Sequence, residues 1–103
     1  MKYILPQSRL EELIMKYLDA KLKNIEEHKS EIAGAPAHWW GVGLDEIFYM
    51  IPDSKGVSGL GISGEFVSSV ERFFSIPFYE AQKYILRWAK NNLGVEPDFY
   101  QVD

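Results

Sequence analysis

Apolar side chains recur at every third or fourth position in three stretches of the chain, which is the spacing of one helix face. These stretches predict three helices, over about residues 9–27, 64–74 and 77–93. Ser8 and Glu11 have the spacing of a capping box at the start of the first helix. Ser63 is a suitable cap for the second helix, and Gly94 is a suitable left-handed end for the third. The first helix is predicted to supply the main core stripe, formed by Leu10, Leu13, Ile14, Tyr17, Leu18 and Leu22.

A run of β-branched and aromatic residues predicts a strand over about residues 46–51. A turn rich in Asp, Ser and Gly follows, and a second strand over about 57–62 completes a predicted β-hairpin. The apolar positions of residues 44–51 also fit helical spacing, so a helix is the alternative for this segment. Short apolar segments at 1–5 and 99–102 are candidate edge strands.

Between the first helix and the hairpin, Gly34 and Pro36 interrupt any periodic pattern. We therefore expect an irregular connection of about ten residues there. Strands and helices are grouped along the chain rather than alternating, which favours the α+β class. The predicted structure is a small antiparallel sheet packed with three helices in a single domain, residues 1–103.

Composition narrows the range of functions. The chain has 103 residues, a formal net charge of −4 and no cysteine, which excludes disulfides, cysteine-bound metals and a thiol nucleophile. Apolar residues make up 47% and charged residues 25%, values typical of a folded globular protein. No apolar run reaches the length of a membrane span, and residues 1–5 are too short for a signal peptide. We expect a cytoplasmic protein that does not enter a membrane.

Residues 59–64, Gly-Leu-Gly-Ile-Ser-Gly, match the glycine pattern of a dinucleotide-binding loop. The context argues against this function. The motif follows a hairpin turn, and no strand ending in an acidic residue lies about 20 residues later. Glu80 has that offset, but it lies on a predicted helix. We interpret the glycines as part of a kinked strand that leads into a capped helix, and expect no cofactor.

Candidate catalytic and metal-binding residues are sparse. Four polar residues cluster near the predicted end of the first helix: Glu26, Glu27, His28 and Glu31. A charged, solvated helix end explains this cluster better than a metal site, which needs ligands converging from several elements. His38 has acidic neighbours but no serine in a nucleophile context. We therefore expect a protein without enzymatic activity.

The aromatic content, 15%, is high for one small core. Trp39 and Trp40 are adjacent, and in an extended segment neighbouring side chains leave on opposite faces, so one ring should lie outside. Exposed aromatic rings often anchor protein–protein contacts. Trp39, Trp40 and Phe48 are thus the candidate interface residues of a predicted homodimer.

Lys83, Arg87 and Lys90 share one face of the last predicted helix. With the helix before it, this helix resembles a helix-turn-helix in outline, and the three cations could contact phosphates. The net negative charge makes nucleic acid the less favoured partner. A nucleic-acid-binding or regulatory module that uses residues 64–93 is the alternative to a protein-interaction module.

Two groups of residues resemble short uncharacterised proteins of tailed bacteriophages of marine bacteria. The N-terminal group is Met1 to Leu5, Ser8, Leu13-Ile14 and Tyr17-Leu18-Asp19. The C-terminal group is Leu60-Gly61-Ile62-Ser63, Phe73-Phe74, Ile85 and Trp88. The resemblance implies a viral accessory or structural protein of the host cytoplasm, and it carries no assigned catalytic residues.

Overall fold

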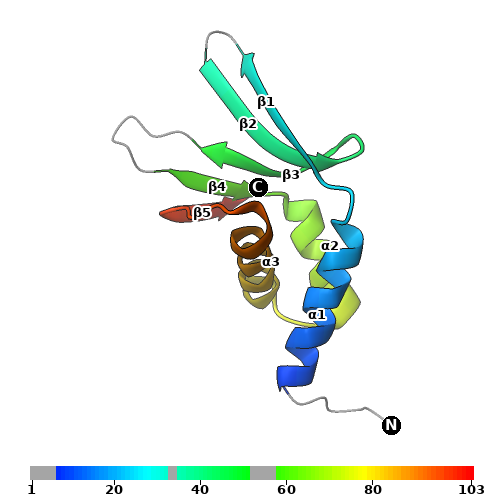
Figure 1. Ribbon diagram of the computed structural model, residues 1–103. Coiled ribbons are helices and arrows are strands. Elements are labelled where there is room, and N and C mark those ends of the chain that lie inside the picture. The colour runs from blue at the N-terminus through cyan, green and yellow to red at the C-terminus, as the bar shows by residue number, and fades with distance from the viewer. Residues whose placement is uncertain (1–6, 33–34, 52–57) are drawn as a thin grey trace.

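The computed structural model describes residues 7–32, 35–51 and 58–103, which form a five-stranded mixed sheet with three helices against one face (Figure 1). In chain order the elements are α1 (Gln7–Lys21), β1 (Glu26–Ile32), β2 (Ala35–Val42), β3 (Asp45–Ile51), β4 (Gly59–Ile62), α2 (Gly64–Phe74), α3 (Phe78–Leu93) and β5 (Phe99–Val102). Helices and strands are segregated into two layers, which confirms the predicted α+β class.

The strands lie in the sheet in the same order as in the chain, with β1 at one edge and β5 at the other. β1 to β4 pair antiparallel. β5 pairs parallel with β4, because α2 and α3 carry the chain back along the helical layer before it rejoins the sheet. The prediction of an antiparallel sheet is therefore wrong at the last strand.

The predicted hairpin is confirmed, since β3 and β4 pair antiparallel with Phe48 opposite Ile62. Residues 45–51 are a strand, so the helical alternative for this segment is wrong. The candidate edge strand at 99–102 is confirmed as β5. The candidate strand at 1–5 lies outside the described residues.

The first helix is shorter than predicted. α1 ends at Lys21, and the amide of Ile25 then donates to the carbonyl of Leu22 at 3.1 Å, in a tight turn that leads into β1. Ser8 lies inside α1 rather than ahead of it, so the predicted capping box does not mark the start of the helix. The helices predicted at 64–74 and 77–93 are confirmed, and the side chain of Ser63 caps α2.

The largest correction concerns residues 26–32 and 35–42, predicted as a helix end and an irregular connection, which instead form β1 and β2. β1 is an edge strand with charged residues on both of its faces, among them Glu26, Glu27 and Lys29. Edge strands use such charges to prevent pairing with further chains. The same charges remove the apolar alternation by which a strand is recognised in a sequence.

The core lies between the sheet and the three helices. Trp40, Phe48, Leu60 and Ile62 project from the sheet into it. The ring of Phe48 lies parallel to that of Trp88 on α3, with 6.2 Å between centroids. The helices contribute these buried side chains: Ile14, Leu18 and Leu22 from α1, Val67 and Val70 from α2, and Ala81, Tyr84, Ile85, Trp88 and Ala89 from α3.

Two polar contacts join α1 to α3 at the margin of the core. The indole Nε1 of Trp88 donates to a carboxylate oxygen of Asp19 at 2.8 Å. The hydroxyl of Tyr84 donates to Glu11 at 3.5 Å. These contacts satisfy the polar atoms of two largely buried aromatic side chains, whose rings pack in the core.

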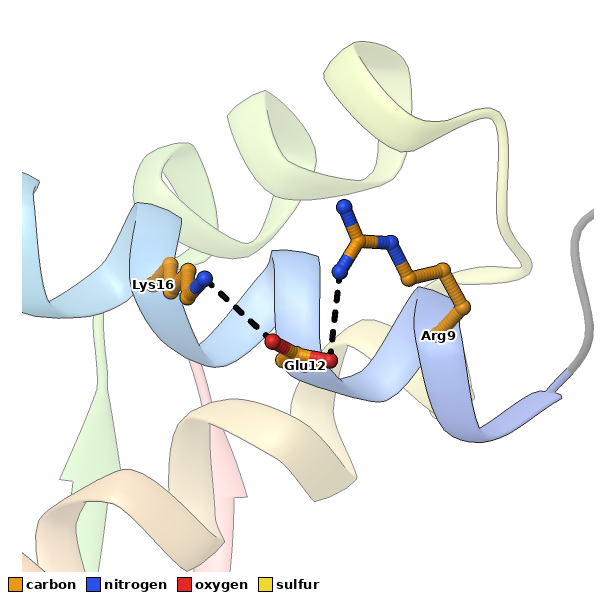
Figure 2. Close-up of polar contacts among 3 residues, drawn as sticks. All are labelled: Arg9, Glu12 and Lys16. Atoms are coloured by element: carbon orange, nitrogen blue, oxygen red, sulfur yellow. Dashed lines mark hydrogen bonds and ion pairs between the residues drawn. The ribbon is translucent and has the colours of Figure 1, made fainter.

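Figure 2 shows a group of exposed ion pairs on α1, in which Glu12 contacts Arg9 at 3.3 Å and Lys16 at 3.2 Å. The hydrogen bond and charge of Lys16, followed by the charge of Arg9, lower the pKa of Glu12 below its ordinary value. Because all three side chains are exposed, solvent screens these pairs and they add little to the stability. The attachment of α1 thus depends on its apolar face.

The first prediction concerns that face. Leu18→Ala should lower the free energy of unfolding by about 2–5 kcal/mol, because Leu18 is fully buried and its loss leaves a cavity. Leu13, predicted as an equal member of the stripe, is only half-buried, so Leu13→Ala should cost clearly less. Urea melts of both variants measure the difference. An equal, small effect at the two positions would contradict this placement of α1.

Candidate functional site

The two faces of the sheet differ sharply in what covers them. Trp40 on β2 pairs with Phe48 on β3, and both side chains point towards the helices. Trp39 pairs with Tyr49, and strand alternation sends these two side chains to the opposite face. All three helices lie on the Phe48 side, so none of them covers the face that holds Trp39 (Figure 1).

Aromatic side chains from four strands gather on this outer face, and we call His28, Trp39, Tyr49 and Phe99 the outer aromatic patch. His28 of β1 pairs with Trp39 of β2, and the two rings stack with 4.0 Å between centroids. Tyr49 of β3 continues the row next to Trp39. Phe99, 40% exposed, lies beyond β4 on β5.

The glycines of β4 make room for two of these rings. A Cβ atom built at Gly61 would overlap the ring of Tyr49, and one built at Gly59 would overlap the ring of Phe99. Both rings therefore lie directly against the backbone of β4. This contact gives a structural role to the first two glycines of the sequence motif, whose third glycine, Gly64, closely approaches the backbone carbonyl of Asp103.

A polar cluster lies at the β5 end of the patch. The hydroxyl of Tyr49 donates to Oδ1 of Asp103 at 2.5 Å, and Nε2 of Gln101 donates to the Tyr49 hydroxyl at 3.4 Å. The hydrogen bond to Asp103 is the main cause that raises the pKa of Tyr49 above its ordinary value of 10.0. The phenol of Tyr49 is thus held neutral and fixed against the sheet.

The charges on the outer face are acidic. Glu26 shares the face of His28, with 3.8 Å between the carboxylate and the imidazole, and Asp103 lies at the other end. None of the described strand residues on this face is Lys or Arg. The outer face therefore offers aromatic surface with an acidic margin and no partner for a phosphate.

Only one of the three predicted interface residues is on the surface. Trp39 is half-buried on the outer face, as alternation within an extended segment predicts. Trp40 and Phe48 are wrong as interface candidates, because they are 3% and 0% exposed and form part of the core. Sequence reasoning missed His28, Tyr49 and Phe99 as members of the patch. Only strand pairing shows that His28 and Tyr49 flank Trp39 and that Phe99 lies on the far side of β4 from Tyr49.

The basic residues Lys83, Arg87 and Lys90 lie on one exposed face of α3, as their spacing predicts. They line a groove of about 470 Å³ whose remaining lining residues are Leu86, Asn91 and Tyr100. Tyr100 comes from β5, so the sheet supplies one wall of this groove. The groove is on the helical side of the sheet and is separate from the outer aromatic patch.

The acidic and histidine residues of β1 and β2 lie on opposite faces of the sheet and do not converge on one site. Glu26 and His28 lie on the outer face, whereas Glu27 lies on the other, where it contacts His38 at 3.0 Å. That hydrogen bond from His38 is the main cause that lowers the pKa of Glu27. Among the described residues no group of three or more acidic or histidine side chains is arranged to hold a metal ion.

A larger hollow of about 880 Å³ lies at the start of α2, and its lining includes Ser63, Ser68, Arg72 and Asp103. Both histidines of the chain lie on β1 and β2, and neither lines this hollow. The serines there consequently have no imidazole within the hollow to act as a base.

Comparison with protein families, with curated proteins and with solved structures finds no significant match to this chain. None of the helices in the described part of the chain is both long and apolar enough to cross a lipid bilayer. Two surfaces of the described chain bear on its function. One is the outer aromatic patch, and the other is the groove lined by Lys83, Arg87, Lys90 and Tyr100, which we call the α3 groove.

The second prediction tests the packing of Tyr49 on Gly61. Gly61→Ala should destabilise the protein by about 1–3 kcal/mol, because the added methyl group displaces the ring. In a Tyr49→Ala background the same change should be neutral or stabilising. The difference between its effects in the two backgrounds, which is the coupling free energy of positions 49 and 61, should be about 0.5–3 kcal/mol. Gly59→Ala in that background is the matched control, and it should stay costly because Phe99 covers Gly59. Unchanged costs in both backgrounds would contradict this packing.

The third prediction concerns ionisation. Tyr49 should titrate above pH 10, because Asp103 stabilises the neutral phenol, and Asp103→Asn should lower the pKa of Tyr49 towards 10.0. The stabilisation that this hydrogen bond contributes should be fully present below pH 10 and should be lost as the pH rises through the pKa of Tyr49 in the folded protein. NMR of ring-labelled tyrosine, in which the Tyr49 signal is assigned with Tyr49→Phe, measures the pKa of Tyr49 in the wild type and in Asp103→Asn. Tyr84, whose pKa is raised mainly by burial, is the internal control and should not respond to Asp103→Asn.

Proposed function

We propose that this protein is a non-catalytic interaction module of the cytoplasm that binds protein through the outer face of its sheet, first of all a second copy of itself. The observation that carries the proposal is the outer aromatic patch, which no described helix covers. A cluster of partly exposed aromatic rings of this kind is typical of interfaces and uncommon on the free surface of a monomer.

The chemistry of the outer face favours a protein partner over a nucleic acid. Rings of Trp39, Tyr49 and Phe99 provide large contact area at a low entropic cost. The charges at the margin, Glu26 and Asp103, would repel a phosphate backbone, and binding of nucleic acid depends on Lys and Arg contacts. A protein surface with apolar residues and hydrogen-bond donors matches this face better.

A two-fold dimer is the simplest assembly that covers the patch. The same surface can pair with itself in an isologous contact, which is the commonest closed arrangement of soluble homo-oligomers. In such a dimer the two rings of Trp39 would be withdrawn from water together with those of Tyr49 and Phe99. The resemblance to tailed-phage proteins, which implies an accessory or structural role, is compatible with a self-associating module of this kind.

The fourth prediction is that the protein sediments as a dimer at concentrations of tens of micromolar. Trp39→Ala should shift the equilibrium towards monomer by at least about 10-fold, the size typical of an aromatic anchor. Gln101→Lys, which adds a charge to the same face and removes no ring, should do the same. Phe73→Ala is the matched control, because Phe73 is 66% exposed but lies on α2, away from the sheet face.

Circular dichroism should verify that each variant is folded before sedimentation is interpreted. A wild-type protein that is monomeric across this concentration range would overturn self-association. A dimer that responds to Phe73→Ala and ignores both Trp39→Ala and Gln101→Lys would place the interface on the helices and contradict the proposed surface.

A further inference from the structure

The groove between α3 and β5 combines positive charge with an aromatic ring. Lys83, Arg87 and Lys90 occupy positions i, i+4 and i+7 of α3, so their side chains leave the helix on one side. Tyr100, 38% exposed, lies across the groove from them on the edge strand β5. Neither element alone creates the site, because α3 supplies the cations and β5, the next element of the chain, supplies the ring.

Positive charge in the groove is strongest at the Lys90 end. Within the described part of the chain Lys90 has no carboxylate within ion-pair distance, whereas Arg87 lies 3.9 Å from Glu11. Lys83 borders a second hollow that also includes Glu11 and Glu80. The acidic side chains are thus gathered at the Lys83 end, and the end nearest Asn91 is available to an anion.

Tyr100 determines what kind of anion fits. It pairs with Leu60 and so lies on the helical side of β5, at the open edge of the sheet. A ring beside a row of cations suits a ligand that carries both a flat base and phosphates. An acidic peptide would use the cations but would gain little from the exposed ring.

We propose that this groove binds single-stranded nucleic acid, with phosphates on the α3 cations and an unstacked base on Tyr100. A duplex fits less well, because its bases are stacked and β5 stands beside α3, which obstructs insertion of that helix into a major groove. The site uses the helical side of the sheet and does not require the dimer, so it extends beyond the proposed function and can fail independently of it.

Fluorescence anisotropy with a labelled oligo-dT, titrated with the full chain at low salt, tests the proposal. Binding should be saturable and should weaken with salt, with a log–log slope of about −2 for three phosphate contacts. Lys90→Gln should weaken binding and reduce the slope by about 0.7. Tyr100→Leu, which keeps an apolar side chain, should weaken binding about 10-fold with little change in the slope.

Matched control variants distinguish binding in this groove from non-specific electrostatic attraction of the oligonucleotide to the protein surface. Lys29→Gln removes one charge at the opposite edge of the sheet, and Phe73→Leu removes an exposed ring from α2; neither should alter binding. Trp39→Ala should leave oligonucleotide affinity unchanged, which distinguishes this test from that of self-association.

Three results would overturn the proposal. The first is no saturable binding at low salt. The second is equal weakening by Lys29→Gln and Lys90→Gln, which would indicate non-specific attraction. The third is binding that Tyr100→Leu leaves unchanged or that a duplex of the same length matches, which would indicate recognition of a polyanion without base stacking.

Discussion

Packing of the sheet on α3 through Phe48 and Trp88 determines where every other surface of this protein lies. Phe48 is fully buried, and its ring faces that of Trp88 at 6.2 Å. Because strand side chains alternate, an inward Phe48 forces Tyr49 outward, and the pairing of β3 with β2 forces Trp39 outward in turn. A register shift of one residue would exchange the two sets and place a core residue in solvent. Burial of Trp40 and Phe48 in the core therefore places Trp39 and Tyr49 on the outer face.

β4 is unusual because its outward positions carry no side chain. Gly59 and Gly61 alternate with Leu60 and Ile62, which are fully buried on the other face. Rings from the flanking strands, Tyr49 from β3 and Phe99 from β5, fill the space that the glycines leave. The sequence motif that resembles a phosphate-binding loop is, in this fold, a strand that supports aromatic rings on one face and the core on the other.

The elements that depend on interactions between residues close in the sequence are the ones that sequence patterns predict. α2, α3 and the hairpin of β3 with β4 follow from periodicity and turn residues, and the alternation of Trp39 and Trp40 follows from strand geometry. The end of α1 and the strand β1 do not, because residues 26–32 carry the charges of an edge strand rather than an apolar pattern. That Tyr100 and Lys90 line one groove is beyond local reasoning too, since the parallel pairing of β5 with β4 depends on the whole crossover.

β5 links the two proposed surfaces. Its four residues alternate, so that Phe99 and Gln101 belong to the outer face while Tyr100 and Val102 face the helical layer. One short strand therefore supplies a ring to the outer aromatic patch and another to the α3 groove. Because the two rings leave opposite sides of the same backbone, a partner on one surface need not displace a partner on the other. Any change in the pairing of β5 with β4, however, would alter both surfaces together, so the integrity of this parallel pairing is the condition on which both binding proposals rest.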